Sequence, residues 1–289
     1  MNMKKHILLI SSLLLAGATA SAATILFDQS FTQDAGTQGS VDGTAVGNAN
    51  TGAGVAATWT AGAGSSGVLR TDGEVFSNLG NASAHIGLGT LVNDAKGTAN
   101  GIFTLTTVMA EPPTGSNWVA GGFATNINVL QNFTNFGGIG NALYRTNGNA
   151  DFFAGPNTGG TAYTDEAVSG TQTFITVLDL STHNNVDDFG TVTYYRGSVA
   201  PGNLEYTFDY TADFSIASAA ISTAASGGEG VIQSFALTQI PEPGTLALVG
   251  IALGTLLIAR GRKEIRSLNL LSVKAVHPHG LFFFQKNPC

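Results

Sequence analysis

Two acids in the second half of the sequence are the candidates for paired-carboxylate chemistry. Glu205 and Asp209 lie four residues apart in the alternating segment 204–210, so a strand there would project both side chains from one face. Paired carboxylates are the machinery of glycoside hydrolysis. No third carboxylate lies between them, and acids on a strand face are usually solvated. An exposed acidic face is therefore the favoured interpretation, and we assign no catalytic residue.

A second candidate is the oxygen-rich segment His183-Asn184-Asn185-Val186-Asp187-Asp188. Calcium takes about six to eight oxygen ligands, so Asp187 and Asp188 are the candidate metal ligands. The spacing is not that of an EF-hand, and Asn and Asp are also common turn formers. We therefore favour a plain turn and predict no cofactor, with calcium at these two residues as the alternative.

The sequence offers few residues for other kinds of hydrolysis or for nucleotide binding. Residues 23–239 contain two histidines, His85 and His183, and lack a Gly-x-Ser-x-Gly turn. His85 lies in an apolar alternating segment and is interpreted as a strand residue. Residues 62–67 match the spelling Gly-x-Gly-x-x-Gly, but no predicted helix follows them, so nucleotide binding is not expected.

Aromatic residues in this region could stack on sugar rings, although we expect most of them in the core. The candidates are Trp118, Tyr144, Tyr194 and Tyr195. A further cluster comprises Tyr163, Asp165 and Glu166, which fits either a polar turn or a ligand site.

The elements that must position these residues are strands. Apolar and polar residues alternate, as expected for half-buried strands, in the segments 101–108, 173–178, 191–195, 204–210 and 231–237. Turn signals such as Asn147-Gly148 and Pro201-Gly202 separate them. A first strand at 24–27 precedes a stretch rich in Gly, Ala and Thr from Ala35 to Gly67, as happens when a terminal strand pairs late in a sheet. Many short strands without helical periodicity predict an all-β sandwich or barrel.

Composition narrows the class of protein. Charged residues make up 11% of the 289 residues, against about 25% in an ordinary protein. Residues 23–239 hold four cations and seventeen acids, whereas the two ends of the chain are basic. This balance argues against nucleic-acid binding and suggests an exported acidic body between two membrane signals.

Both ends of the chain have the pattern of membrane signals. Residues 1–22 combine Lys4 and Lys5, a short apolar segment and a small-residue cleavage site, which predicts a secretory signal peptide with a signal helix. Near the other end, residues 244–259 carry no charge and are followed by the cations Arg260, Arg262 and Lys263. The apolar run predicts a transmembrane helix, and the cations predict a stop-transfer cluster on its cytoplasmic side.

The triplet Pro241-Glu242-Pro243 stands directly before this apolar run. The ordered combination of triplet, apolar helix and basic cluster in an exported protein resembles the PEP-CTERM sorting signal. The resemblance implies that the triplet is the recognition motif for an exosortase, and that residues 240–266 form the sorting signal. Members of that family usually end shortly after the basic cluster, whereas this chain continues through an atypical tail, residues 267–289.

The region 23–239 resembles a concanavalin A-like lectin/glucanase jelly roll in the segments 26–31, 118–123 and 174–196 and in the closing strand. The resemblance implies a β-sandwich ectodomain between the signal helix and the transmembrane helix. Enzymes of that fold use Glu-x-Asp-x-Glu on one strand, a spacing that is absent here.

Together these features predict an exported, envelope-sorted, non-enzymatic protein of the bacterial cell surface or exopolysaccharide matrix, with carbohydrate as its expected ligand. The expected partners are an exosortase, exopolysaccharide and, before processing, the inner membrane. Two alternatives remain open: a divergent glycoside hydrolase or lyase of the same fold, and a structural surface protein without a ligand.

Overall fold

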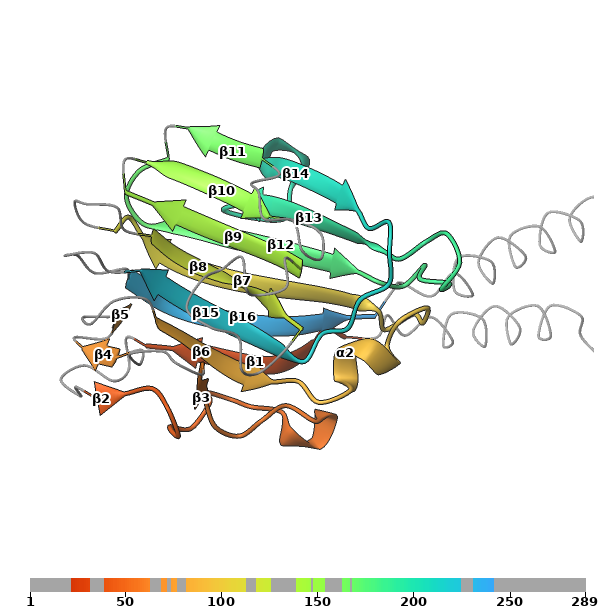
Figure 1. Ribbon diagram of the computed structural model, residues 1–289, viewed down its shortest axis with the longest axis horizontal. Coiled ribbons are helices and arrows are strands. Elements are labelled where there is room, and N and C mark those ends of the chain that lie inside the picture. Colours follow the sequence, from red (N-terminus) through yellow and green to blue (C-terminus); the bar gives the residue numbers. More distant parts are fainter. Residues whose placement is uncertain are drawn as a thin grey trace, which may run out of the picture. The chain divides into compact units, whose positions relative to one another are not determined.

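Two antiparallel β-sheets packed face to face form the body of the protein in the computed structural model (Figure 1). The structure describes residues 22–31, 39–62, 69–71, 74–76, 82–112, 118–125, 139–146, 148–153, 163–166, 168–224 and 231–241. These residues belong to one compact unit, Ser21–Glu242. The predicted all-β sandwich of the jelly-roll type is therefore confirmed.

The larger sheet has nine strands in the order β14-β13-β12-β7-β16-β5-β4-β2, with β1 also paired to β16. Their bounds are β1 Thr24–Ser30, β2 Gly39–Ser40, β4 Leu69–Thr71, β5 Glu74–Phe76, β7 Ile102–Ala110, β12 Gln172–Asp179, β13 Thr191–Arg196, β14 Leu204–Asp209 and β16 Val231–Ile240. Burial alternates residue by residue along β7, because one face of the strand packs on the core and the other is only half-buried. This is the period-two pattern that the sequence displays.

The smaller sheet has seven strands in the order β11-β10-β9-β8-β15-β6-β3. Their bounds are β3 Thr60–Ala61, β6 Ala82–Gly87, β8 Trp118–Ala124, β9 Ile139–Arg145, β10 Asn149–Phe153, β11 Tyr163–Glu166 and β15 Ser218–Ala224. Strands β8 and β9 are buried on both faces, and a second small apolar cluster lies on the face away from the main core. The short helices are η2 Thr51–Ala53, α2 Leu91–Asp94 and η4 Pro201–Asn203.

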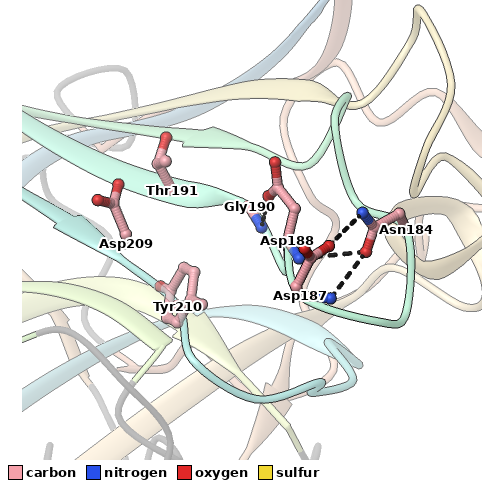
Figure 2. A pocket seen from close by; sticks show the side chains of 7 residues that line it. All are labelled: Asn184, Asp187, Asp188, Gly190, Thr191, Asp209 and Tyr210. Carbon is pink, nitrogen blue, oxygen red and sulfur yellow. Dashed lines mark hydrogen bonds between the residues drawn. The ribbon is translucent and has the colours of Figure 1, made fainter.

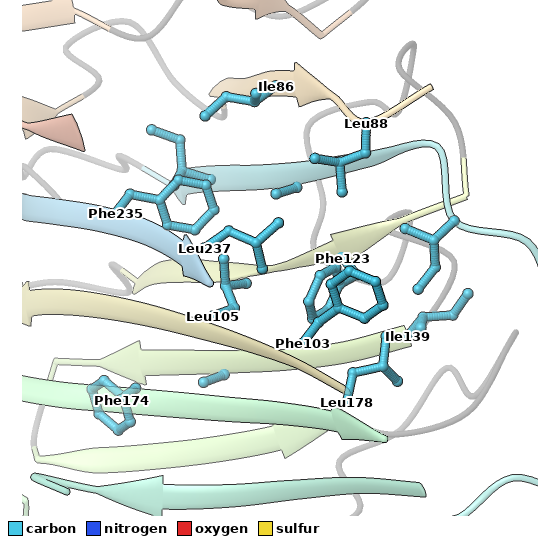
Figure 3. Packing of buried hydrophobic residues seen from close by; sticks show 14 of the residues in the cluster. Ile86, Leu88, Phe103, Leu105, Phe123, Ile139, Phe174, Leu178, Phe235 and Leu237 are labelled. Atoms are coloured by element: carbon cyan, nitrogen blue, oxygen red, sulfur yellow. The ribbon is translucent and has the colours of Figure 1, made fainter. Parts of the chain in front are cut away.

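Aromatic and aliphatic side chains from both sheets fill the space between them (Figure 3). Phe235 of β16 packs against Phe27 and Trp59, with ring centroids 5.3 and 6.0 Å away. The two sheets approach closely at Gly121, where an added Cβ would lie 2.5 Å from the Thr107 hydroxyl oxygen on the opposite sheet. Side-chain packing of this kind stabilises the sandwich through apolar burial, at about 25 cal/mol per Å².

The first and last strands of the body are neighbours. Strand β1 pairs with β16, and Thr24 lies opposite Gln239. The predicted late pairing of the first strand is therefore confirmed. The segment expected to be irregular between residues 35 and 67 contains only β2, η2 and β3 among its described residues.

No helix among the described residues is long and apolar enough to cross a membrane. The predicted signal helix in residues 1–22 and the predicted span 244–259 lie outside the described residues, apart from Ala22. So do Glu242, Pro243 and the cluster Arg260, Arg262 and Lys263, whereas Pro241 is described and directly follows β16.

Candidate functional site

A pocket of about 530 Å³ opens where the β12–β13 loop meets the end of β14 (Figure 2). It is lined by Asn184, Asp187, Asp188, Gly190, Thr191, Asp209 and Tyr210. Thr191 and Asp209 lie opposite one another in the register of β13 and β14, so the sheet itself fixes one wall. The volume is within the range of about 300–1,000 Å³ that is common for small-molecule sites.

Asn184 organises the loop that forms the other wall. Its Oδ1 accepts hydrogen bonds from the backbone N–H groups of Val186, Asp187 and Asp188 at 2.9, 3.1 and 3.1 Å. Its Nδ2 donates to Asp187 Oδ1 at 2.8 Å. Asn185 has a φ of 61°, a left-handed conformation that Asn tolerates better than most residues. One side chain thus closes the whole turn, which explains why Asn and Asp dominate this segment.

Gly190 joins the loop to β13. Its φ is +92°, and an added Cβ would lie 2.4 Å from the Asp179 carbonyl oxygen, so a larger residue would displace the loop from β12. Its N–H donates to Asp188 Oδ1 at 3.0 Å, and its carbonyl accepts from Tyr210 N at 2.9 Å. The carboxylate of Asp188 is therefore held against the sheet.

A cluster of buried His183, partly buried Lys96 and exposed Asp213 holds the start of the loop. His183 is buried, and its Nε2 lies 2.9 Å from Asp213 Oδ1. Lys96 Nζ lies 2.6 Å from the same oxygen and also contacts the Phe214 carbonyl and ring. Burial alone would raise the pKa of Asp213, but the hydrogen bonds from Lys96 and His183 outweigh it and hold this pKa below its usual range.

Tyr210 forms the apolar part of the lining. Its ring packs on Phe208 and Phe214, with centroids 5.4 and 4.3 Å away. The hydroxyl is buried without a hydrogen-bond partner, and burial raises the pKa of this group well above its ordinary value. The pocket therefore combines an aromatic wall with a set of hydrogen-bond acceptors, of which the carboxylates of Asp187 and Asp209 are exposed.

The arrangement suits hydrogen-bond acceptance better than metal coordination. Asp187 and Asp188, the predicted metal ligands, do lie in one pocket. One oxygen of each already accepts a hydrogen bond from within the loop, and the described residues include no group of three His, Cys, Asp or Glu that could hold a metal. Calcium needs about six to eight oxygens, so these residues as they stand do not fit the ion. No step in the function proposed below depends on calcium.

Glu205 and Asp209 both lie on β14 but have different surroundings. Glu205 Oε1 is 2.9 Å from Arg196 Nε, whereas Asp209 is exposed at the pocket and has no ion-pair partner among the described residues. Four residues along a strand span about 13 Å, which is too far for a catalytic carboxylate pair at about 5–9.5 Å. This geometry argues against the two acids acting together.

The predicted cluster on β11 belongs to a contact between the edges of the two sheets. Arg196 of β13 reaches Asp165 of β11 with 3.0 Å between Nη2 and Oδ2, so this side chain links the sheets. The Tyr163 ring stacks on Tyr206 of β14, with centroids 5.7 Å apart. Glu166 ends β11. These contacts assign a structural role to Tyr163 and Asp165.

The remaining sequence candidates are mostly structural. Tyr144 and Tyr194 are fully buried, which confirms the expectation for these two aromatics, whereas Trp118 and Tyr195 are half-buried. His85 is a buried strand residue, as predicted, with Nδ1 3.2 Å from Ser218 Oγ. Of the glycine-rich segment 62–67, only Gly62 is described.

Sequence reasoning missed Thr191, Gly190 and Tyr210 as parts of the pocket. The pairing of Thr191 with Asp209 depends on strand register, which composition does not reveal. Tyr210 directly follows Asp209 in the alternating segment, and that adjacency was the available signal.

The fold is a two-sheet antiparallel β-sandwich of the jelly-roll type, with a polar pocket at one end of the larger sheet. No protein-family model and no curated protein sequence matches the chain. The metal-free carbohydrate recognition domain of Emp46p is similar in structure, with a TM-score of 0.41, 12% identity, and coverage of 64% of this chain and 88% of that one. The Ca²⁺/Man-bound exoplasmic/lumenal domain of VIP36 has a TM-score of 0.38 and 10% identity, over 63% and 82% of the two chains. A GH43 glycoside hydrolase has a TM-score of 0.37 and 12% identity, over 63% of this chain and 36% of that one. Likeness at this level is a likeness of fold and carries no argument about ligands.

Proposed function

We propose that this chain is an exported, non-enzymatic surface or exopolysaccharide-matrix protein whose sandwich binds carbohydrate in the pocket between the β12–β13 loop and β14. The observation that carries the proposal is the acceptor-rich lining of that pocket. Sugar hydroxyls are hydrogen-bond donors, and a hydroxyl donates a stronger hydrogen bond to a charged carboxylate than to a neutral acceptor. Asp187 and Asp209 are exposed at the pocket, and the Tyr210 ring lies beside them.

The hydrogen-bond and ion-pair partners of the individual carboxylates support a non-enzymatic role. Asp187 and Asp188 accept hydrogen bonds within their own loop. Glu205 forms an ion pair with Arg196 and lies about 13 Å along β14 from Asp209. Such groups can bind and orient a ligand, but none has the partner that general acid–base catalysis of glycoside hydrolysis requires.

Binding is tested with residues 22–241 on a panel of bacterial polysaccharides and their constituent sugars, with and without calcium. We expect millimolar or tighter binding to at least one glycan, with a loss of roughly tenfold or more, about 1.4 kcal/mol, for Asp209→Asn. The matched control is Asp28→Asn, which removes an exposed carboxylate from β1. Absence of binding across the panel would favour the structural alternative, and release of cleaved sugar would favour the enzymatic one.

Export and sorting are the second part of the proposal, and they are supported by the sequence signals at the two ends. An exosortase would recognise Pro241-Glu242-Pro243 after the span 244–259 has entered the inner membrane, with Arg260, Arg262 and Lys263 on the cytoplasmic side. C-terminal peptide mass spectrometry on the native envelope fraction tests this step. We expect a mature terminus near residues 240–243. Intact peptides through Cys289 would contradict the sorting proposal.

A further inference from the structure

Arg145 on the outer face of the smaller sheet combines a fixed position with an exposed charge. Strands β8, β9 and β10 are neighbours in that sheet (Figure 1). Arg145 ends β9 and lies opposite Trp118 of β8 and Asn149 of β10. Its Nε pairs with the carboxylate of Asp151, a side chain that is only 4% exposed, whereas the Arg145 side chain is 49% exposed. The guanidinium is therefore held at one edge while much of the side chain remains in contact with solvent.

The buried carboxylate of Asp151 is what positions the arginine. Asp151 lies on the face turned away from the main core, since Ala150 and Phe152 on either side of it belong to that core. A carboxylate out of water is costly unless it is paired and hydrogen-bonded. Thr164 Oγ1 donates to Asp151 Oδ1 at 2.7 Å, and Arg145 pairs with Oδ2. No second partner for the guanidinium is found among the described residues, so the N–H donors of its two terminal nitrogens are left for a ligand.

Trp118 adds an aromatic surface beside this guanidinium. It is half-buried and packs on the small apolar cluster of the outer face, so its ring lies on the same face of the sheet as Arg145. Residues directly opposite one another in an antiparallel pair have Cβ atoms about 4.5–5.5 Å apart. An indole ring offers a large apolar surface, against which the C–H groups of a sugar ring can pack. The two side chains together offer apolar contact for a ring and a cationic fork for a substituent on that ring.

The charge of this face is opposite to that of the pocket. Residues 23–239 contain four cations, Arg70, Lys96, Arg145 and Arg196. Lys96 and Arg196 are 13% and 33% exposed and form ion pairs that hold the body together. The described residues that line the pocket include three aspartates and no cation. The planar fork of an arginine matches a carboxylate, and other acids of the body act on such a ligand only within about 10 Å at 0.1 M salt.

We propose that Trp118 and Arg145 form a second carbohydrate site that binds an acidic sugar: the ring packs on Trp118, and its carboxylate accepts hydrogen bonds from the terminal nitrogens of Arg145. The inference extends the proposed carbohydrate function, because it assigns a uronic acid to the sheet face and leaves neutral sugars to the pocket. Asp151 and Thr164 are positioning residues, since they act through the guanidinium.

The two sites lie at opposite ends of the sandwich and on different sheets. At the pocket, Thr191 is two strands away from Ile102, the first residue of β7. Tyr144, which precedes Arg145, donates from its hydroxyl to the carbonyl of Gly170 at 2.9 Å, just before β12, and the start of β12 pairs with the last part of β7. The nine residues of β7 span about 27 Å. One molecule can therefore hold two glycan strands at once.

Oligomers of galacturonic acid and their methyl esters test the second site, because esterification removes the charge and keeps the ring. Binding is measured by calorimetry on the full chain in mild detergent. We expect the acid to bind roughly tenfold more tightly than the ester, as a charge-assisted hydrogen bond implies, with a preference that shrinks as salt is added. Tryptophan fluorescence should respond to the acid, and the response should vanish in Trp118→Phe, since Trp59 is buried in the core.

The deciding variant removes both members of the ion pair. Arg145→Gln alone would leave Asp151 buried without its partner, so it is combined with Asp151→Asn. This double variant should bind the acid roughly tenfold more weakly and the ester as well as before. Arg145→Lys keeps the charge without the fork and should retain only part of the preference. Asp209→Asn is the matched control, because it removes a carboxylate from the pocket and should leave acid binding unchanged.

Equal affinity for acid and ester, or a preference that survives the double variant, would overturn the second site. A preference that Asp209→Asn also abolishes would place the acid in the pocket and overturn the inference as well. If thermal unfolding shows that the double variant does not fold, the decision rests on Arg145→Lys, in which the preference must fall. Failure of neutral glycans to bind would refute the function proposed for the pocket alone, because the acid preference and the Trp118 signal report on the sheet face.

Discussion

Glutamine in place of Glu205 should destabilise the sandwich, whereas asparagine in place of Asp209 should not. The Glu205 carboxylate makes a charge-assisted hydrogen bond of 2.9 Å to Arg196, and its side chain is only 11% exposed. A hydrogen bond to a charged group contributes about 1.5–3 kcal/mol, and a fully exposed ion pair contributes about 0.2–1 kcal/mol. Because Arg196 is 33% exposed and keeps its contact with Asp165, we expect a loss of about 1.5 kcal/mol for Glu205→Gln.

The assay is urea denaturation of residues 22–241 followed by tryptophan fluorescence, which comes from Trp59 in the core and from half-buried Trp118. At about 2–4 °C per kcal/mol for a chain of this size, Glu205→Gln should also lower the Tm by about 4 °C. Asp209→Asn should change the free energy of unfolding by less than about 0.5 kcal/mol, as is usual at the surface. In a double-mutant cycle, Glu205→Gln should lower the free energy of unfolding only slightly further once Arg196→Met has removed the ion pair.

Equal destabilisation by the two substitutions would refute the division between a structural acid and a ligand-binding acid. An unchanged midpoint for Glu205→Gln would show that the link between the sheet edges contributes nothing measurable. A catalytic pair would behave differently from either, since both variants would then lose a polysaccharide-cleaving activity while folding normally.

Four further perturbations follow from the same structure. Tyr210→Phe removes a buried hydroxyl without a partner, so urea denaturation should show a free energy of unfolding that is unchanged or higher by up to about 1 kcal/mol. A lower free energy of unfolding would mean that the hydroxyl makes a hydrogen bond. The lowered pKa of Asp213 adds stability that is present above about pH 4 and disappears as the pH falls, so the acid side of a Tm-against-pH curve should be shallower for Asp213→Asn than for the native chain. Burial, with the nearby charge of a glutamate, raises the pKa of Tyr144 to about 12, so this group's stabilisation is complete below about pH 10 and is lost towards pH 12; Tyr144→Phe should flatten that alkaline decline. Gly122→Ala would place a Cβ 1.5 Å from Asn141 Oδ1 and should cost about 1–3 kcal/mol or more in denaturant, a cost that Asn141→Gly in the same chain should partly relieve.

The sequence predicted the larger sheet far better than the smaller one. Strand β7 alternates between buried and half-buried residues, and the alternation of Phe103, Leu105 and Thr residues in the sequence reflects it directly. Strands β8 and β9 are buried on both faces, so small apolar residues follow one another without a period of two. The sequence therefore marks the strands of one sheet and gives little sign of most strands of the other.

The candidate site was predictable as a loop but not as a pocket. Asn184, Asp187 and Asp188 form a recognisable polar turn in the sequence. That this turn faces Asp209 depends on the β13–β14 register, and that register depends on core packing of residues such as Val192 and Phe208. Glu205 and Asp209 look equivalent in the sequence because their different neighbours, Arg196 and the pocket loop, come from other segments.

The pairing of the first strand with the last has a consequence for the order of events during biogenesis. Strand β16 is the final element of the body, yet it is the neighbour of β1, β5 and β7 near the middle of the nine-stranded sheet. A chain that is synthesised from its N-terminus therefore cannot complete this sheet until residue 240 has left the ribosome. Contacts of such high contact order also form slowly, because a long loop must close before any of them is made. The nine-stranded sheet consequently forms only when almost all of the body has been synthesised.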